Sequence, residues 1–168
     1  MHRTTTTLAW VLAAVIACMP APALAQEPGH ATVRQLELGV YYAAPERLAG
    51  SISGLFLKPD PTSRNWVSGT ALTLRAAAGQ GGVSAGIGVR APRYFSFGPE
   101  ALMTVTRTFS SPRGGTGQST YVGVEVGYVS MGRVSIGVAR QVDGPSDRRD
   151  TILTWSVGVQ FPYGFWRW

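Results

Sequence analysis

The segment at residues 153–161 alternates bulky apolar residues with small or polar ones. Its apolar positions are Leu153, Trp155, Val157, Val159 and Phe161. The intervening positions are Thr154, Ser156, Gly158 and Gln160. Successive side chains of an extended strand point to opposite faces, so this segment predicts a strand with one wholly apolar face. A chain that closes on such a strand is expected to build a sheet and to keep this face away from water.

The same alternation recurs along most of the chain. We predict eight extended segments, separated by turns rich in Gly, Pro, Asn, Asp and Ser, at residues 32–43, 49–58, 67–78, 82–91, 100–109, 119–130, 133–142 and 151–161. The parity is unclear at Leu55-Phe56-Leu57, which predicts a bulge there. The fifth segment is also irregular. Beyond the N-terminal leader no segment has a helical period, so the fold class is expected to be all-β.

The N-terminus reads as a cleaved secretory signal peptide over residues 1–25. His2 and Arg3 precede an apolar run, and Ala23-Leu24-Ala25 supplies a small-x-small cleavage site. The run is shorter than the roughly 20 residues that a transmembrane helix needs. An alternative takes residues 15–18 as a lipobox, in which Cys18 is lipidated after cleavage.

Cleavage after Ala25 leaves a chain long enough for one domain with a core. It also removes the only cysteine, Cys18, which excludes disulfide and thiolate chemistry from the processed chain. His30 is then the only histidine, and we expect no metal or other cofactor. The net charge is +6, but the arginines are dispersed, so nucleic acid is not an expected partner.

The direction of the apolar face decides the class of sheet protein. A soluble barrel would turn its Val and Ile face inward and show Gly, Ser and Ala to water. Soluble sheets guard their surface with charge, whereas only 14% of this chain is charged and Lys58 is its only lysine. With the apolar face turned toward lipid, the small residues fill a narrow lumen. We therefore predict an antiparallel, up-and-down transmembrane β-barrel of about eight strands.

Taken together, the chain resembles the small eight-stranded outer-membrane β-barrel proteins of Gram-negative bacteria. The local motif is the closing strand, in which Trp155, Val157, Val159 and Phe161 resemble the family's signal for the outer-membrane assembly machinery. The resemblance implies a location in the outer membrane, contact with its lipids and lipopolysaccharide, and a small, porin-like, monomeric barrel.

The chain departs from that pattern after Phe161. Pro162 has no amide hydrogen and is expected to end the strand. We therefore expect a barrel domain over residues 26–161 and an aromatic C-terminal extension over 162–168. Alternatively, Trp168 itself is the terminal aromatic residue. With both termini in the periplasm, residues 110–118 and 143–150 become external loops, and the periplasmic connection 59–66 is longer than the family has.

Five polar residues share the parity of the small, luminal face. They are Glu37, Arg75, Arg90, Glu125 and Gln160. Since buried charges are tolerated when they are paired, both signs on this face predict a luminal ion-pair network. Such a network acts either as a plug that holds the barrel together or as a polar gate in a narrow pore. We favour the plug.

These features predict a structural or surface-interaction protein without catalytic activity. The first alternative is a periplasmic or secreted eight-stranded barrel that holds a small apolar ligand. A second is a lipid-modifying enzyme of the outer membrane, for which His30 would have to supply the general base. Residues 147–150, Asp-Arg-Arg-Asp, together with Arg113, form either a site for anionic lipopolysaccharide or an ordinary solvated loop.

Overall fold

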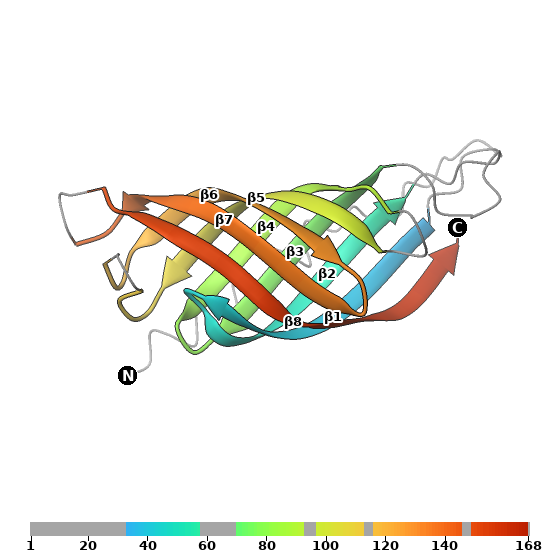
Figure 1. Cartoon of the computed structure of the whole chain (residues 1–168), viewed down its shortest axis with the longest axis horizontal. Coiled ribbons are helices and arrows are strands. Elements are labelled where there is room, and N and C mark those ends of the chain that lie inside the picture. Colours follow the sequence, from blue (N-terminus) through green and yellow to red (C-terminus); the bar gives the residue numbers. More distant parts are fainter. Residues whose placement is uncertain (1–32, 58–69, 93–96, 113–115, 146–148, 168) are drawn as a thin grey trace. The chain divides into compact units, whose positions relative to one another are not determined.

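The computed structural model describes residues 33–57, 70–92, 97–112, 116–145 and 149–167. It contains eight strands: β1 (Val33–Ala44), β2 (Arg47–Leu57), β3 (Ala71–Gly79), β4 (Gly82–Arg90), β5 (Gly98–Thr108), β6 (Thr120–Val129), β7 (Gly132–Asp143) and β8 (Thr151–Arg167). Each strand pairs antiparallel with its sequence neighbour, and β8 pairs with β1 to close a barrel (Figure 1). The predicted all-β, up-and-down, eight-stranded architecture is confirmed.

The two ends of the barrel differ in their connections. At one end, here called the loop end, lie the connections 45–46, 80–81, 109–119 and 144–150. The other end, here called the terminal end, holds the start of β1 and the end of β8 (Figure 1). The connection 59–66 and the expected signal peptide lie outside the described residues. No helix in the described ranges is long and apolar enough to cross a bilayer.

Backbone hydrogen bonds join three neighbouring connections at the loop end. The Gly81 amide donates to the Glu46 carbonyl at 2.9 Å, and the Phe109 amide donates to the Gly81 carbonyl at 2.8 Å. A Cβ on Gly81 would lie 2.1 Å from the Pro45 carbonyl oxygen, so glycine is required for this close approach. These contacts fix the β1–β2 and β3–β4 turns against the start of the β5–β6 connection.

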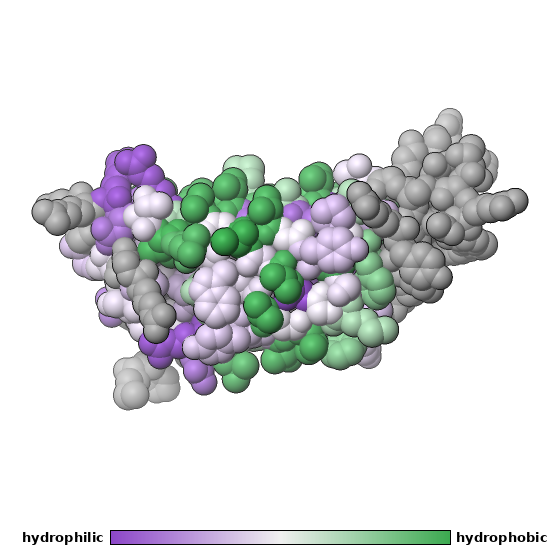
Figure 2. Space-filling view, in the orientation of Figure 1, coloured by the Kyte–Doolittle hydropathy of each residue, from purple (hydrophilic) through white to green (hydrophobic). Residues whose placement is uncertain are grey.

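The barrel wall is apolar on its outside. Val124 is 54% exposed, Val134 59% and Ile136 54%, while the intervening residues of β6 and β7 face the interior. Figure 2 shows apolar side chains across the middle of the barrel and hydrophilic ones gathered at the loop end. We call these outward apolar residues of the strands the apolar belt. The valines of this belt therefore do not form the core of the barrel.

The interior carries small and polar side chains, with apolar layers toward the ends. Leu55, Leu57 and Ala71 form a buried cluster near the terminal end. Tyr121 packs with Ala139 and Ile152 near the loop end. Between these layers the strands contribute glycine, serine, threonine and charged residues, and the charged residues build the candidate site.

The expected bulge at residues 55–57 is absent from strand β2. This strand pairs with β1 and β3 in unbroken register, and Leu55 and Leu57 point inward while Phe56 lies between them on the outer side. The sequence parity was ambiguous because the lumen is apolar at this level, so both faces of the strand read as hydrophobic. The register shifts instead between Leu36 and Glu37 on the β1–β8 side, and between Thr120 and Tyr121 on the β6–β7 side.

The prediction that Pro162 ends the closing strand is wrong, because β8 continues in register with β1 to Arg167. The Gln160 amide donates to the Met131 carbonyl, on the β7 side of the strand. Amide groups two residues apart point the same way, so the Pro162 nitrogen points to that side also, beyond the start of β7 at Gly132. The register shift between Leu36 and Glu37 is a bulge in β8, in which Tyr163 is the extra residue. Pairing with β1 resumes at Gly164.

Candidate functional site

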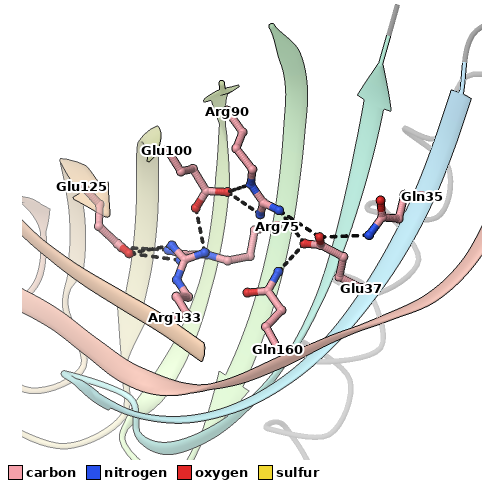
Figure 3. A network of polar contacts seen from close by, with 8 residues as sticks. All are labelled: Gln35, Glu37, Arg75, Arg90, Glu100, Glu125, Arg133 and Gln160. Atoms are coloured by element: carbon pink, nitrogen blue, oxygen red, sulfur yellow. Dashed lines mark hydrogen bonds and ion pairs between the residues drawn. The ribbon is translucent and has the colours of Figure 1, made fainter. Parts of the chain in front are cut away.

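Six charged side chains from six strands meet inside the barrel (Figure 3). They form one chain of alternating charge, here called the ion-pair chain, which runs Glu37, Arg90, Glu100, Arg133, Glu125 and Arg75. Each member is at most 8% exposed. The three carboxylates and three guanidinium groups balance in charge, as buried ions require.

Arg90 of β4 joins the two carboxylates nearest the terminal end. Its Nη1 donates to both oxygens of Glu37, at 2.8 and 2.9 Å. Its Nε and Nη2 donate to Oε2 of Glu100, at 3.0 and 2.6 Å. This side chain is completely buried. The fork of donors on a guanidinium suits this double role, which a lysine could not fill.

Arg133 of β7 continues the chain from β5 to β6. Its Nη1 lies 2.7 Å from Oε1 of Glu100, and its Nη2 donates to Oε1 of Glu125 at 2.8 Å. On the other side of Glu125, Arg75 forms a bidentate pair, with Nη1 at 3.0 Å and Nη2 at 2.7 Å from the two carboxylate oxygens. Bidentate pairs of this kind fix geometry as well as charge.

Two glutamines donate further hydrogen bonds to Glu37, the first residue of the ion-pair chain. Gln35 Nε2 donates to Glu37 Oε1 at 3.2 Å, and Gln160 Nε2 donates to Glu37 Oε2. Gln160 lies on β8 and Glu37 on β1, so this contact ties the side chains of the strand pair that closes the barrel. The chain thereby links side chains from seven of the eight strands.

The five residues singled out from parity all lie in this interior network: Glu37, Arg75, Arg90, Glu125 and Gln160. Sequence reasoning missed Glu100, Arg133 and Gln35. Arg133 precedes Ser135 and Gly137 at the parity of the small face, and that signal could have found it. Glu100 was harder to find, because Leu102 and Thr104 share its inward face and obscure the alternation.

The motif residues of the closing strand lie on the opposite face of the wall. Trp155, Val157, Val159 and Phe161 point outward and are 37%, 53%, 47% and 58% exposed. None of them contributes to the ion-pair chain. They belong to the apolar belt, so the two sets of residues singled out from the sequence occupy the two faces of one wall.

The interior leaves little free space beside the network. A cavity of about 10 Å³ borders Arg75 and Glu125 and extends toward Glu46 in the β1–β2 turn. Hydroxyl side chains line it: Ser84, Thr104, Thr106, Thr154 and Ser156. Its size is close to the minimum that one water molecule needs. It is too small for an organic ligand.

The described residues contain no group of three or more His, Cys, Asp or Glu side chains that could hold a metal ion. His30 and Cys18, on which the enzyme and lipoprotein alternatives rest, lie outside these ranges. Comparison of the chain with protein-family models, with curated proteins and with solved structures gives no match. The fold that the structure defines is a closed, eight-stranded antiparallel β-barrel with an apolar outer face and a polar interior.

Proposed function

We propose that the processed chain is a small integral β-barrel of the outer membrane of a Gram-negative bacterium. It acts as a structural or surface-interaction protein, with a closed lumen and without catalytic activity. The observation that carries this proposal is the inverted distribution of polarity, with valines outside and paired charges inside. This distribution suits a barrel whose surrounding solvent is hydrocarbon.

The apolar belt supports integration into lipid. Along β6 and β7 every outward position from Val122 to Val126 and from Val134 to Val138 is aliphatic and exposed. In water a continuous apolar surface of this kind would be unusual, because monomeric soluble proteins rarely expose apolar patches of more than about a few hundred square ångströms. In a bilayer it is the ordinary outer surface of a transmembrane barrel. Closure of the sheet satisfies the backbone groups, as hydrocarbon requires.

The interior of the barrel favours the plug rather than the open pore. Arg75 reaches across the lumen from β3 to Glu125 of β6, and Arg90 reaches from β4 to Glu37 of β1; both arginines are at most 6% exposed. A permeating ion or solute would have to break several charge-assisted hydrogen bonds, which are the stronger class of such bonds. An apolar ligand would have to displace the same network, so the filled polar lumen argues against a ligand-binding barrel.

Membrane fractionation with a gel of boiled and unboiled samples tests the proposal. We expect the protein in the outer-membrane fraction, extracted by detergent, with faster migration before boiling than after. Recovery in the soluble periplasmic fraction without detergent would overturn the membrane assignment and favour the ligand-binding alternative.

The closed lumen has its own test. Purified protein in a planar lipid bilayer is expected to show no steady ion conductance, because the ion-pair chain and its flanking apolar layers fill the interior. Steady conductance of the unmodified protein would refute the plug and favour the gate. A lipid-modifying activity lost on His30→Ala would instead revive the enzyme alternative.

A further inference from the structure

Three arginines stand on the outer side of the barrel at the loop end. Arg107 lies near the end of β5, Arg140 near the end of β7, and Arg149 just before β8. Arg140 and Arg149 are exposed, and the Arg107 side chain is 43% exposed. We call these three residues the arginine patch.

The strand register places Arg107 and Arg140 close to one another. Arg140 is opposite Val122 of β6, and Val122 is opposite Val105 of β5, two residues before Arg107. Since neighbouring strands are about 4.8 Å apart, β5 and β7 are separated by roughly 10 Å, and the two-residue offset along β5 brings the separation of the two arginine backbones to roughly 12 Å. Two long arginine side chains can span this gap and approach one phosphate-sized anion between them. Arg149 precedes Thr151, which is opposite Arg140 on β8.

The arginine patch contains more guanidinium groups than the neighbouring carboxylates bind. Arg107 is held in place by Thr120 at 2.8 Å and by Asp143 at 3.0 Å, and Asp150 accepts a hydrogen bond from Thr116 at 2.6 Å. Arg140 and Arg149 have no ion pair with another described residue. Their guanidinium groups are therefore available to an anion from outside the chain.

The surface next to the patch is aliphatic. Val105, Val122 and Val138 lie immediately on its belt side and are 50%, 37% and 51% exposed. Figure 2 shows the hydrophilic loop end adjoining the apolar belt. An anion that fits both surfaces carries hydrocarbon beside its charge. That is the chemistry of a phosphorylated lipid at the headgroup level of a bilayer.

We infer that the arginine patch binds the phosphate groups of a phosphorylated glycolipid, the lipid A part of lipopolysaccharide, in the outer leaflet. This inference rests on the proposed function and on the expected orientation, in which both termini lie in the periplasm and the loop end is at the cell surface. Arginine recognises phosphate through bidentate, charge-assisted hydrogen bonds, while the acyl chains lie along the valines of the belt. The outer face of strands β5 to β8, next to the patch, is then the lipid-binding side of the barrel.

Native mass spectrometry of the full protein in neutral detergent, titrated with bisphosphorylated lipid A, tests the inference. Each arginine near an anionic lipid surface is worth about fivefold in affinity, so the double variant Arg140→Gln/Arg149→Gln is expected to bind roughly 20- to 30-fold more weakly. The matched control is Arg47→Gln, which removes an exposed charge from the start of β2 at the same end. It is expected to bind like the unmodified protein.

Dephosphorylated lipid A provides the second arm. We expect it to bind weakly and equally to all three proteins, and we expect 10-fold excess inorganic phosphate to leave the binding of bisphosphorylated lipid A unchanged. Equal binding of the phosphorylated lipid to the double variant and the control, or its displacement by inorganic phosphate, would overturn the inference. Insertion of the unmodified protein into vesicles of phosphatidylcholine alone tests the proposed function separately, since this lipid is neutral and lacks lipid A.

Discussion

The two faces of strand β6 meet opposite physical demands within one run of sequence. Its outward residues Val122, Val124 and Val126 are 37–56% exposed. Its inward residues Gly123, Glu125 and Gly127 fit against neighbouring backbone and arginines. The outer face needs only to be apolar, whereas each inner residue needs a particular size or a particular partner. Substitutions should therefore fail for different reasons on the two faces.

The largest effect is expected from breaking the ion-pair chain. Arg133→Ala leaves Glu100 and Glu125 each without one buried partner, and removal of one member of a buried pair costs about 3–5 kcal/mol. We expect this loss in the free energy of unfolding, measured by urea titration in phosphatidylcholine vesicles with tryptophan fluorescence as the signal. A loss below 1 kcal/mol would mean that the chain does not hold the strands together. Since Arg133→Ala also removes packing, Arg133→Met is the companion variant, and we expect it to be destabilised too.

The outer face is expected to reject charge. Val124→Arg and Ile136→Arg should each cost roughly 2–4 kcal/mol if these residues face the middle of a bilayer. The same urea titration measures the loss, and Val124→Leu is the control that changes size without adding charge. It is expected to be nearly neutral. If arginine at both positions leaves unfolding unchanged, this face does not contact hydrocarbon.

An added methyl group is expected to destabilise the barrel on the inner face and not on the outer face. A matched pair of glycines, one on each face, tests this. A Cβ on Gly123 would lie 2.3 Å from the Val138 carbonyl oxygen, so Gly123→Ala should cost about 1–3 kcal/mol by overpacking. A Cβ on the outward Gly50 would meet nothing closer than 4.0 Å. Gly50→Ala should therefore be neutral or stabilise by up to about 1 kcal/mol. Equal effects of the two variants would contradict the assigned faces.

The period of two in the sequence was enough to predict the strand number, the antiparallel closure and the orientation of the wall. It was also enough to place Glu37, Arg75, Arg90, Glu125 and Gln160 on the inner face. Parity predicts on which face of the wall a residue lies, but not its level along the barrel axis. Which carboxylate meets which guanidinium depends on the register of all eight strands, and Glu37 and Arg90 are brought together across the barrel only by its closure.

Three failures of sequence reasoning have two physical origins. Glu100 and the pair Leu55 and Leu57 were misjudged because the lumen is apolar in some layers and polar in others, while the rule assumed one character throughout. Pro162 was misjudged because the effect of proline depends on which side of the strand its nitrogen faces. That direction follows from the bonding of Gln160 to the β6–β7 turn, which only the folded chain shows.

The smallest effect is expected from the charge pair on the outside of the wall at the loop end. Arg107 and Asp143 are 3.0 Å apart, slightly farther than the 2.6–2.8 Å of the buried pairs, and their side chains are 43% and 73% exposed. Exposed pairs are worth about 0.2–1 kcal/mol, since water and salt screen them. Arg107→Ala should accordingly lower the free energy of unfolding by less than about 1 kcal/mol, and the difference should shrink further in 1 M salt. The loss for Arg133→Ala should change little with salt, because its partners are buried. A salt response of equal size in both variants would mean that solvent reaches the ion-pair chain. The charged groups of the inner face would then be screened as those of the outer face are, which contradicts the assigned difference between the two faces.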